Sequence, residues 1–241
     1  MDLGLIGVIY NYGVSIAAGY AFWCILSATL HEYAHAWVAT RLGDPLPRLM
    51  GRLTLNPAAH IVWWSFITFL LFGVWFSANP VHAGPYRANP LRRIAVFSAG
   101  PAVNLVLFLA CWCAIAVLYP AQIRDTSSLI ELRQSVSPGF DRQLLLLLIL
   151  GANLNGLMVI WSLLPLPGFD GAHLLGSISK SLDRVLFSPI AFRAAWYICW
   201  ALLLVTAMNL FGSRALWAII YRSAFDWGYG LAVRLAAYLA N

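Results

Sequence analysis

The chain has 241 residues, of which 61% are hydrophobic and only 10% are charged. Soluble domains carry about 25% charged residues, so this composition excludes a soluble globular protein and predicts an integral membrane protein. The formal net charge of +6 reflects membrane topology and anionic lipid rather than nucleic acid, because no basic run is long enough to form a nucleic-acid-binding tail.

Residues 3–42 form one long apolar stretch with few polar interruptions. At 1.5 Å per residue the stretch is longer than one bilayer crossing, so it predicts a first crossing followed by a second helix. We expect a bend near Asn11–Gly13 or at Gly19. The sequence Gly43-Asp44-Pro45 predicts the end of the second helix.

This second helix carries His31-Glu32-Tyr33-Ala34-His35, an HExxH motif in an apolar stretch. Two histidines four residues apart lie on one helix face and can bind one zinc ion. The glutamate can act as general base toward a water molecule that the metal activates. The alternative is a set of buried polar residues that hydrogen-bond within a helix bundle. Each would need its own partner, and ionisable groups at membrane depth suggest function, so we favour the metal site.

The next segments are less regular. Residues 61–76 are apolar but only 16 residues long, near the lower limit for a crossing, so they either cross the bilayer or re-enter it. Residues 79–90 are rich in Pro, Gly and Asn and predict extended or turn structure. Residues 94–118 are a clear membrane span.

The second half of the chain predicts further helices. Residues 119–143 form the main polar loop, and residues 144–164 form another clear span that ends at the Pro- and Gly-rich residues 165–171. Residues 190–210 predict a third clear span, and residues 216–239 either cross at a tilt or lie as an amphipathic helix.

Together these segments predict an all-α polytopic membrane protein. We expect a bundle of about five or six transmembrane helices, with a re-entrant or short extended segment between the first two core helices. The segment 41–93 carries six arginines, and Lys180 and Arg184 follow later. The positive-inside rule therefore places both regions on the cytoplasmic side, provided that residues 61–76 do not cross.

A catalytic zinc ion usually takes three protein ligands, so a third ligand is needed beside the motif. The candidates are His60, His82, His173 and the acidic residues. Asp170 stands out because it follows an apolar span that prolines break, and irregular backbone near membrane depth needs protein or a water-filled cavity around it. The alternative is that Asp170 is only the N-cap of the next helix. We favour a ligand.

Four segments, in this order and spacing, resemble the site-2 protease family of intramembrane zinc metalloproteases. The resemblance covers about two thirds of the chain, residues 21–175. The segments are the HExxH at residues 31–35, the connector at 51–60, Ala99-Gly100-Pro101-Ala102-Val103-Asn104, which matches the family's GPxxN element, and residues 163–171, which resemble its LLPxPxLDG motif.

The resemblance implies that His31, His35 and Asp170 bind zinc, that Glu32 is the catalytic base and that Asn104 supports the site. The family usually has an asparagine directly before its Leu-Leu-Pro sequence, where it is thought to steady the substrate or its oxyanion.

This chain has Ser162 at that position. A serine hydroxyl donates one hydrogen bond but reaches less far, and loss of an oxyanion donor costs about 2.7–4 kcal/mol of barrier. Either activity is reduced or another group takes over the role. Asn155 is a candidate for such support, although it lies about two helical turns away.

The remaining polar residues have simpler interpretations. We expect His60 to pin the connector by a hydrogen bond rather than to bind metal. His82 either contacts substrate in an edge strand or lies in a solvated turn. His173 should lie near the site but face away from Asp170, and Arg92 and Arg93 should mark the membrane interface.

The preferred hypothesis is an intramembrane zinc metalloprotease that cleaves peptide bonds in or near transmembrane segments. Its partners would be a single-span membrane-protein substrate, a membrane regulatory partner and the lipid bilayer, with no nucleic acid. Residues 1–241 would form one membrane-embedded domain, with a core at 21–175 and C-terminal helices at 190–241. No segment resembles a PDZ or CBS module.

We expect a multi-pass protein in the bacterial plasma membrane, with an active site that opens toward the cytoplasm. The extended segment at residues 79–90 would pair with an unwound substrate by β-addition. The alternative is a non-proteolytic zinc-binding paralogue or a membrane metal transporter. Ser162 favours this alternative, whereas Glu32 argues against it, because a pure binding site needs no base.

Overall fold

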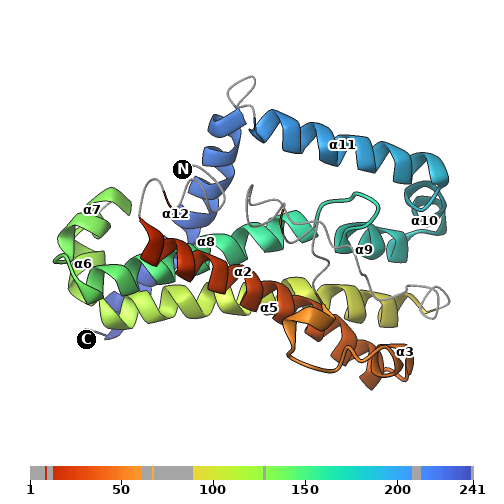
Figure 1. The fold of residues 1–241 in the computed structure, drawn as a ribbon, viewed down its shortest axis with the longest axis horizontal. Helices are drawn as coiled ribbons and strands as arrows, with labels where there is room; N and C mark the ends of the chain where they lie inside the picture. The colour runs from red at the N-terminus through yellow and green to blue at the C-terminus, as the bar shows by residue number, and fades with distance from the viewer. Residues whose placement is uncertain are drawn as a thin grey trace.

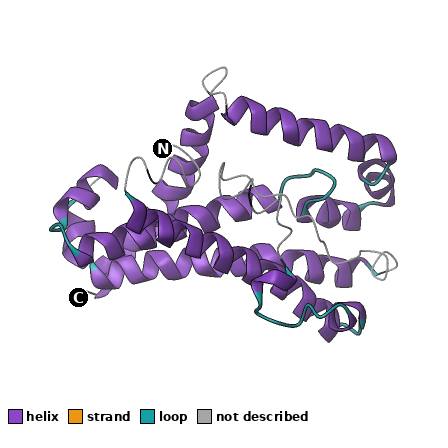
Figure 2. Cartoon of the chain, viewed as in Figure 1, coloured by secondary structure: helices purple, strands orange, loops and turns teal. Residues whose placement is uncertain are grey.

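The computed structural model describes residues 9, 13–60, 67, 89–126, 129–207 and 213–239, and every regular element in these residues is a helix (Figure 2). Within the described residues, three helices are long and apolar enough to cross a membrane: α2 (Val14–Arg41), α5 (Pro90–Leu118) and α8 (Phe140–Ser162). The all-α membrane fold is therefore confirmed. The predictions for residues 61–76 and for most of residues 79–90 lie outside the described residues, so the number of crossings stays a prediction.

Helix α2 is continuous from Val14 to Arg41 and carries the HExxH motif. Gly13 precedes it with a φ of 85°, a left-handed conformation that favours glycine, so the break falls at Gly13 and not at Gly19. The helix ends where predicted, because Gly43 is also left-handed with a φ of 92°. Near this end the Arg41 guanidinium lies over the Trp37 ring, 5.1 Å from its centre.

A short connector follows α2. It contains α3 (Leu46–Leu49) and the 3₁₀-helix η1 (Pro57–Ala59). The Nε2 atom of His60 lies 2.7 Å from the carbonyl oxygen of Thr54, and His60 is buried. His60 therefore pins the connector, as predicted.

Helix α5 packs against both α2 and α8, and Figure 1 shows the three long helices side by side. Helices α2 and α8 also touch, because a glycine on each admits a large side chain from the other. An added Cβ at Gly19 would overlap the Leu147 side chain, and one at Gly151 would overlap Trp23. The Trp23 Nε1 atom donates to the Leu147 carbonyl at 2.9 Å. These contacts fix the HExxH helix within the bundle.

The prediction that residues 119–143 form a polar loop is wrong. The segment contains α6 (Pro120–Asp125), α7 (Leu129–Ser135) and the first residues of α8. Ile123, Leu132 and Val136 are buried in a core cluster with side chains of α5, α8 and α12. Burial of these three apolar side chains favours helix, while the charged residues occupy the exposed faces.

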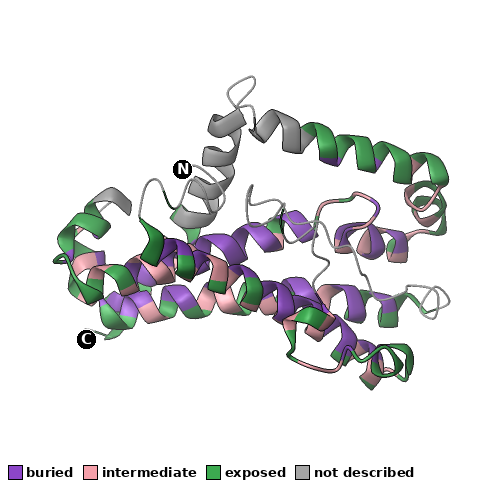
Figure 3. Ribbon diagram, in the orientation of Figure 1, coloured by how far each residue is buried: buried purple, intermediate pink, exposed green. Residues whose placement is uncertain are grey.

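The described residues after α8 also form α9 (Asp170–Ile178), α10 (Lys180–Leu186), α11 (Pro189–Ala207) and α12 (Ser213–Leu239). Helix α12 packs against α5, α6 and α8, and its Tyr229 hydroxyl donates to the Ile123 carbonyl at 2.9 Å. The described part of α11 is largely exposed (Figure 3). Apolar side chains such as Ile190 and Trp196 lie on this exposed surface, which suits contact with lipid.

Candidate metal centre

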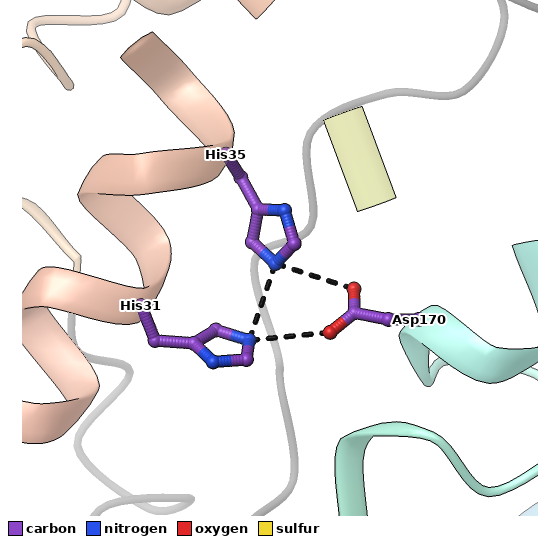
Figure 4. Close-up of side chains that lie close together, drawn as sticks. All are labelled: His31, His35 and Asp170. Carbon is purple, nitrogen blue, oxygen red and sulfur yellow. Dashed lines mark hydrogen bonds and ion pairs between the residues drawn. The ribbon is translucent and has the colours of Figure 1, made fainter. Parts of the chain in front are cut away.

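The two histidines of the HExxH motif and Asp170 meet between α2 and the start of α9 (Figure 4). The Nε2 atoms of His31 and His35 lie 3.1 Å apart. The Asp170 carboxylate lies against both rings, with Oδ2 3.2 Å from His31 Nε2 and Oδ1 3.3 Å from His35 Nε2. The structure thus brings together the three residues that the sequence predicted as ligands.

The outer nitrogen of each ring is held by an oxygen atom of α5. His31 Nδ1 hydrogen-bonds with the Asn104 side-chain oxygen, and His35 Nδ1 lies 2.7 Å from the Val96 carbonyl oxygen. These oxygens only accept hydrogen bonds, so each Nδ1 carries the proton. Each Nε2 therefore turns a lone pair toward the centre, which is the arrangement of histidines that bind metals.

The chemistry of this donor set fits a zinc ion. Two imidazole lone pairs and a carboxylate face one another at 3.1–3.3 Å with no hydrogen atom between them, an arrangement that repels unless a cation sits among them. Zinc bonds of 2.0–2.1 Å directed to the corners of a tetrahedron separate ligand atoms by about 3.3–3.4 Å, close to these distances. Both the types of donor atom and the distances between them match those of a tetrahedral zinc site.

Asp170 faces the centre and not the end of its own helix, because its two carboxylate oxygens lie against the two imidazoles. Asp170 is the first residue of α9, and the residue at the N-cap position is Phe169, which makes no side-chain cap. The carboxylate thus points at the two imidazoles rather than capping the helix.

Two glycines allow the centre to form. A Cβ at Gly100 of α5 would lie 2.5 Å from His31 Nε2 and would overlap His35 Nε2. A Cβ at Gly171 would overlap the Leu163 carbonyl oxygen at the end of α8. Only glycine permits these approaches. The sequence analysis did not assign a role to Gly100, although its place in the GPxxN element was the available signal.

The predicted supporting residues differ in how they reach the centre. Asn104 is fully buried, contacts His31 directly and donates from Nδ2 to the Asn155 side-chain oxygen at 2.9 Å. Asn155 donates to the Gly151 carbonyl at 2.8 Å, so it acts on His31 only through Asn104. Ser162 donates to the Val159 carbonyl of its own helix at 3.1 Å.

Glu32 lies on α2 beside His31 and is 4% exposed. Its position in the sequence sets the carboxylate one residue from a ligand, as an HExxH base requires. A buried carboxylate in an apolar helix is costly, which favours a chemical role.

The expectation that Arg93 marks the membrane interface stays a prediction, but its side chain turns into the protein. Arg93 is buried, and its Nη1 atom lies 2.6 Å from Asp183 Oδ1. His173 faces Arg93, as the expectation that it turns away from Asp170 requires, and its ring stacks on Phe97 with 3.8 Å between centroids. Burial, and then the Arg93 charge, lower the pKa of His173 to about 4. His82 lies outside the described residues.

The sequence is similar to that of known proteins over most of its length. The model of peptidase family M50 matches residues 20–206. "Putative zinc metalloprotease YwhC" from Bacillus subtilis is 28% identical over 210 residues, which cover 87% of this chain and 89% of that protein. "Putative zinc metalloprotease Rip2" from Mycolicibacterium smegmatis is 28% identical over 193 residues, which cover 77% of this chain and 66% of that protein. No solved structure gives a significant match.

Proposed function

Because the chain belongs to peptidase family M50, we propose that it is an intramembrane zinc metallo-endopeptidase that cleaves other membrane proteins in or near their transmembrane segments. The family match also confirms the resemblance to the site-2 proteases. The observation that carries the proposal is the meeting of His31, His35 and Asp170 in a bundle of apolar helices, beside the glutamate of the same motif.

His31, His35 and Asp170 would hold the zinc ion. When bound, zinc supplies Lewis acidity, which activates a water molecule and polarises a peptide carbonyl. Asn104 and Val96 keep both imidazoles in the orientation that turns Nε2 inward. Glu32 would accept a proton from the attacking water and pass it to the leaving amine nitrogen.

The substrate follows from the location of the site. A transmembrane helix keeps its carbonyl groups hydrogen-bonded within itself, so it must unwind locally before attack. Gly or Pro near the cleaved bond would promote this unwinding. We propose a single-span membrane-protein substrate, a membrane regulatory partner and a role in regulated intramembrane proteolysis.

Provided that residues 61–76 do not cross the bilayer, the arginine-rich segments favour an opening of the site on the cytoplasmic side of a bacterial plasma membrane. Water reaches the metal from that side, and the surrounding lipid excludes it from the others. The protein would be multi-pass, with residues 1–241 in one membrane-embedded domain.

One observation favours a second candidate, a non-proteolytic zinc-binding paralogue or metal transporter. The Ser162 hydroxyl, at the family's substrate-steadying position, is hydrogen-bonded to its own helix at Val159. A hydroxyl directed there offers no donor to an oxyanion. Glu32 favours the enzyme, because a pure metal-binding site has no use for a base at that position.

Replacement of Glu32 separates the two functions. We expect Glu32→Gln to keep the bound zinc but to lose cleavage of a model transmembrane substrate by 100-fold or more, on the order of the contribution of a general base. Purified protein in detergent is assayed for zinc by elemental analysis and for cleavage by gel electrophoresis.

Glu131→Gln is the matched control, since Glu131 is exposed on α7. It should cleave like the wild type. Equal cleavage by the wild type and Glu32→Gln would refute the proposed mechanism. Zinc uptake into vesicles that contain the wild type, without any cleavage, would establish the second candidate instead.

A further inference from the structure

A second buried polar cluster lies beside the metal centre, at the N-terminal end of α5. Arg93 is only 3% exposed. Its Nη1 atom donates to Asp183 of α10 at 2.6 Å, and its Nη2 atom donates to His173 Nδ1 of α9 at 3.3 Å. One guanidinium group therefore joins three helices.

The surroundings of Arg93 are shaped to receive it. The guanidinium carbon lies 5.1 Å from the centre of the Phe187 ring, and His173 lies between Phe187 and Phe97, with centroid distances of 4.6 Å and 3.8 Å. Gly176 leaves room on α9, because an added Cβ would lie 2.9 Å from Arg93 Nη2. This face of α9 thus admits the guanidinium closely.

A buried ion pair such as Arg93–Asp183 is weak evidence that the pair stabilises the fold. Burial of an arginine and a carboxylate is expensive, and apolar residues of similar volume often stabilise a fold as well or better. The Arg93 Nε atom is in addition buried without a hydrogen-bond partner in the described structure. Because burial of the two charges costs free energy that the ion pair regains only in part, we look for its role in the relative positions of the helices that it joins.

The geometry that it controls is the position of Asp170. Helix α9 packs mainly against α5 and α10, and Asp170 is its first residue. His173 follows on the same short helix, about one turn later. A shift of α9 along α5 would therefore move the carboxylate relative to the two imidazoles on α2.

We infer that Arg93 is a positioning residue, which locks α9 and α10 onto α5 through His173 and Asp183 and so sets the place of the Asp170 carboxylate at the metal centre. The inference rests on the proposed zinc site. It assigns to Arg93 no contact with substrate.

Zinc affinity tests the inference directly, by competition with a chelator. Loss of a direct partner of a metal ligand typically costs 10–100-fold in metal affinity. Arg93 and Asp183 act one step further out, so we expect weaker zinc binding in Arg93→Gln and in Asp183→Asn, by up to that factor. Arg93→Lys, which keeps the charge, should recover part of the affinity. Arg92→Gln, the same change at the exposed neighbour, should bind zinc like the wild type.

A purely structural role would not alter the metal's coordination, so the visible absorption of the Co²⁺-loaded protein is the second measurement. We expect Asp183→Asn to change the spectrum at a temperature at which circular dichroism shows that the metal-free variant is still folded. The double variant Arg93→Gln/Asp183→Asn should bind zinc no more weakly than Arg93→Gln, because both changes break one link. If Arg93→Gln fails to fold, the zinc affinities and Co²⁺ spectra of Asp183→Asn and Arg93→Lys test the inference.

Wild-type affinity and a wild-type Co²⁺ spectrum in Asp183→Asn and in the folded Arg93 variants would overturn the inference and leave the proposed function intact. Failure of the wild type itself to bind zinc, tested beside Asp170→Asn, would instead refute the proposed function and the inference with it.

Discussion

Three histidines near the centre have different chemical properties because their Nδ1 atoms have different partners. His31 and His35 donate from Nδ1 to oxygen atoms of α5, so their Nε2 lone pairs face the metal position. His173 faces a guanidinium, which can only donate, so its Nδ1 accepts and its Nε2 carries the proton. His173 is thus a neutral acceptor for Arg93 and unsuited to bind zinc through Nε2.

The low pKa of His173 predicts a pH dependence of stability. Its pKa falls from 6.5 to about 4 on folding, because burial and then Arg93 disfavour the charged form. The unfolded chain therefore binds a proton below pH 6.5 that the folded chain refuses, so stability is lost as the pH falls from about 6.5 to 4. The linkage amounts to about 3 kcal/mol.

The difference between the wild type and His173→Gln isolates this contribution, measured as the free energy of unfolding of metal-free protein between pH 7 and pH 4. The wild type should lose up to about 3 kcal/mol more over this interval than the variant. Arg92→Gln, a change at an exposed residue beside Arg93 that does not titrate in this interval, is the control and should follow the wild type. Parallel pH profiles for the wild type and His173→Gln would contradict the expected shift.

At the residue level, the sequence predicted what a motif specifies. His31, His35 and Asp170 carry the chemistry in their side chains, and the spacing of the four motifs was enough to bring them together. The burial of Arg93 could not be predicted, since an arginine before an apolar span usually lies at the interface. Only the arrangement of α5, α9 and α10 supplies its partners.

Helix α5 is the element on which the whole centre is built. One face of it supplies the Val96 carbonyl to His35, the bare Cα of Gly100 to both rings, the Asn104 side chain to His31 and the Arg93 guanidinium to α9. These residues follow a spacing of three or four, so they lie on one side of the helix. The second core helix thus organises ligands that belong to other helices.

Substitution at Gly100 tests this close approach of α5 and α2. We expect Gly100→Ala to lose bound zinc and to destabilise the protein by about 1–3 kcal/mol, because the methyl group occupies space that the two imidazoles fill. Zinc content and the free energy of unfolding are measured together. Gly230→Ala in α12 is the control, since nothing lies within 4 Å of its added Cβ, and it should bind zinc normally. A Gly100→Ala variant with the zinc content of the wild type would contradict this expectation, because it would show that α5 and α2 can move apart without loss of the metal site.

The elements that sequence analysis misjudged are the amphipathic ones. The spans at residues 94–118 and 144–164 were recognised from length and apolarity alone, and the span at residues 190–210 stays a prediction. Helices α6 and α7 were missed because each is short and about half charged or polar, so their helical state depends on burial of Ile123 and Leu132 against partners that lie far away in the sequence.

For the whole molecule, the metal centre is a cross-link between distant parts of the chain. Its candidate ligands come from α2 and from α9. In the sequence, the long helices α5 and α8 lie between these two helices. Among the closely packed helix pairs, α2 and α9 are each joined to α5. A bound ion would therefore link α2 directly to α9, whereas without it the two helices are joined through their packing on α5.

Removal of the metal should weaken the fold for this reason. A ligand that binds only the folded state adds about 2.7 kcal/mol at a free concentration 100-fold above its Kd, so chelation should lower the melting temperature of the wild type. Scanning fluorimetry with chelator and after zinc is restored measures the effect. Asp170→Asn should respond much less, and an equal response in both proteins would place the stabilising ion elsewhere.

The end of α2 limits how deep the chemistry can lie. His35 precedes Arg41 by six residues, roughly 9 Å along the helix, while the hydrocarbon layer is about 30 Å thick. His31 precedes Arg41 by ten residues, roughly 15 Å, so with the Arg41 and Trp37 pair at the headgroup level the two histidines would lie between about 9 Å deep and the midplane. If the proposed cleavage takes place there, each fragment of a cut substrate would keep an apolar segment too short to span the bilayer.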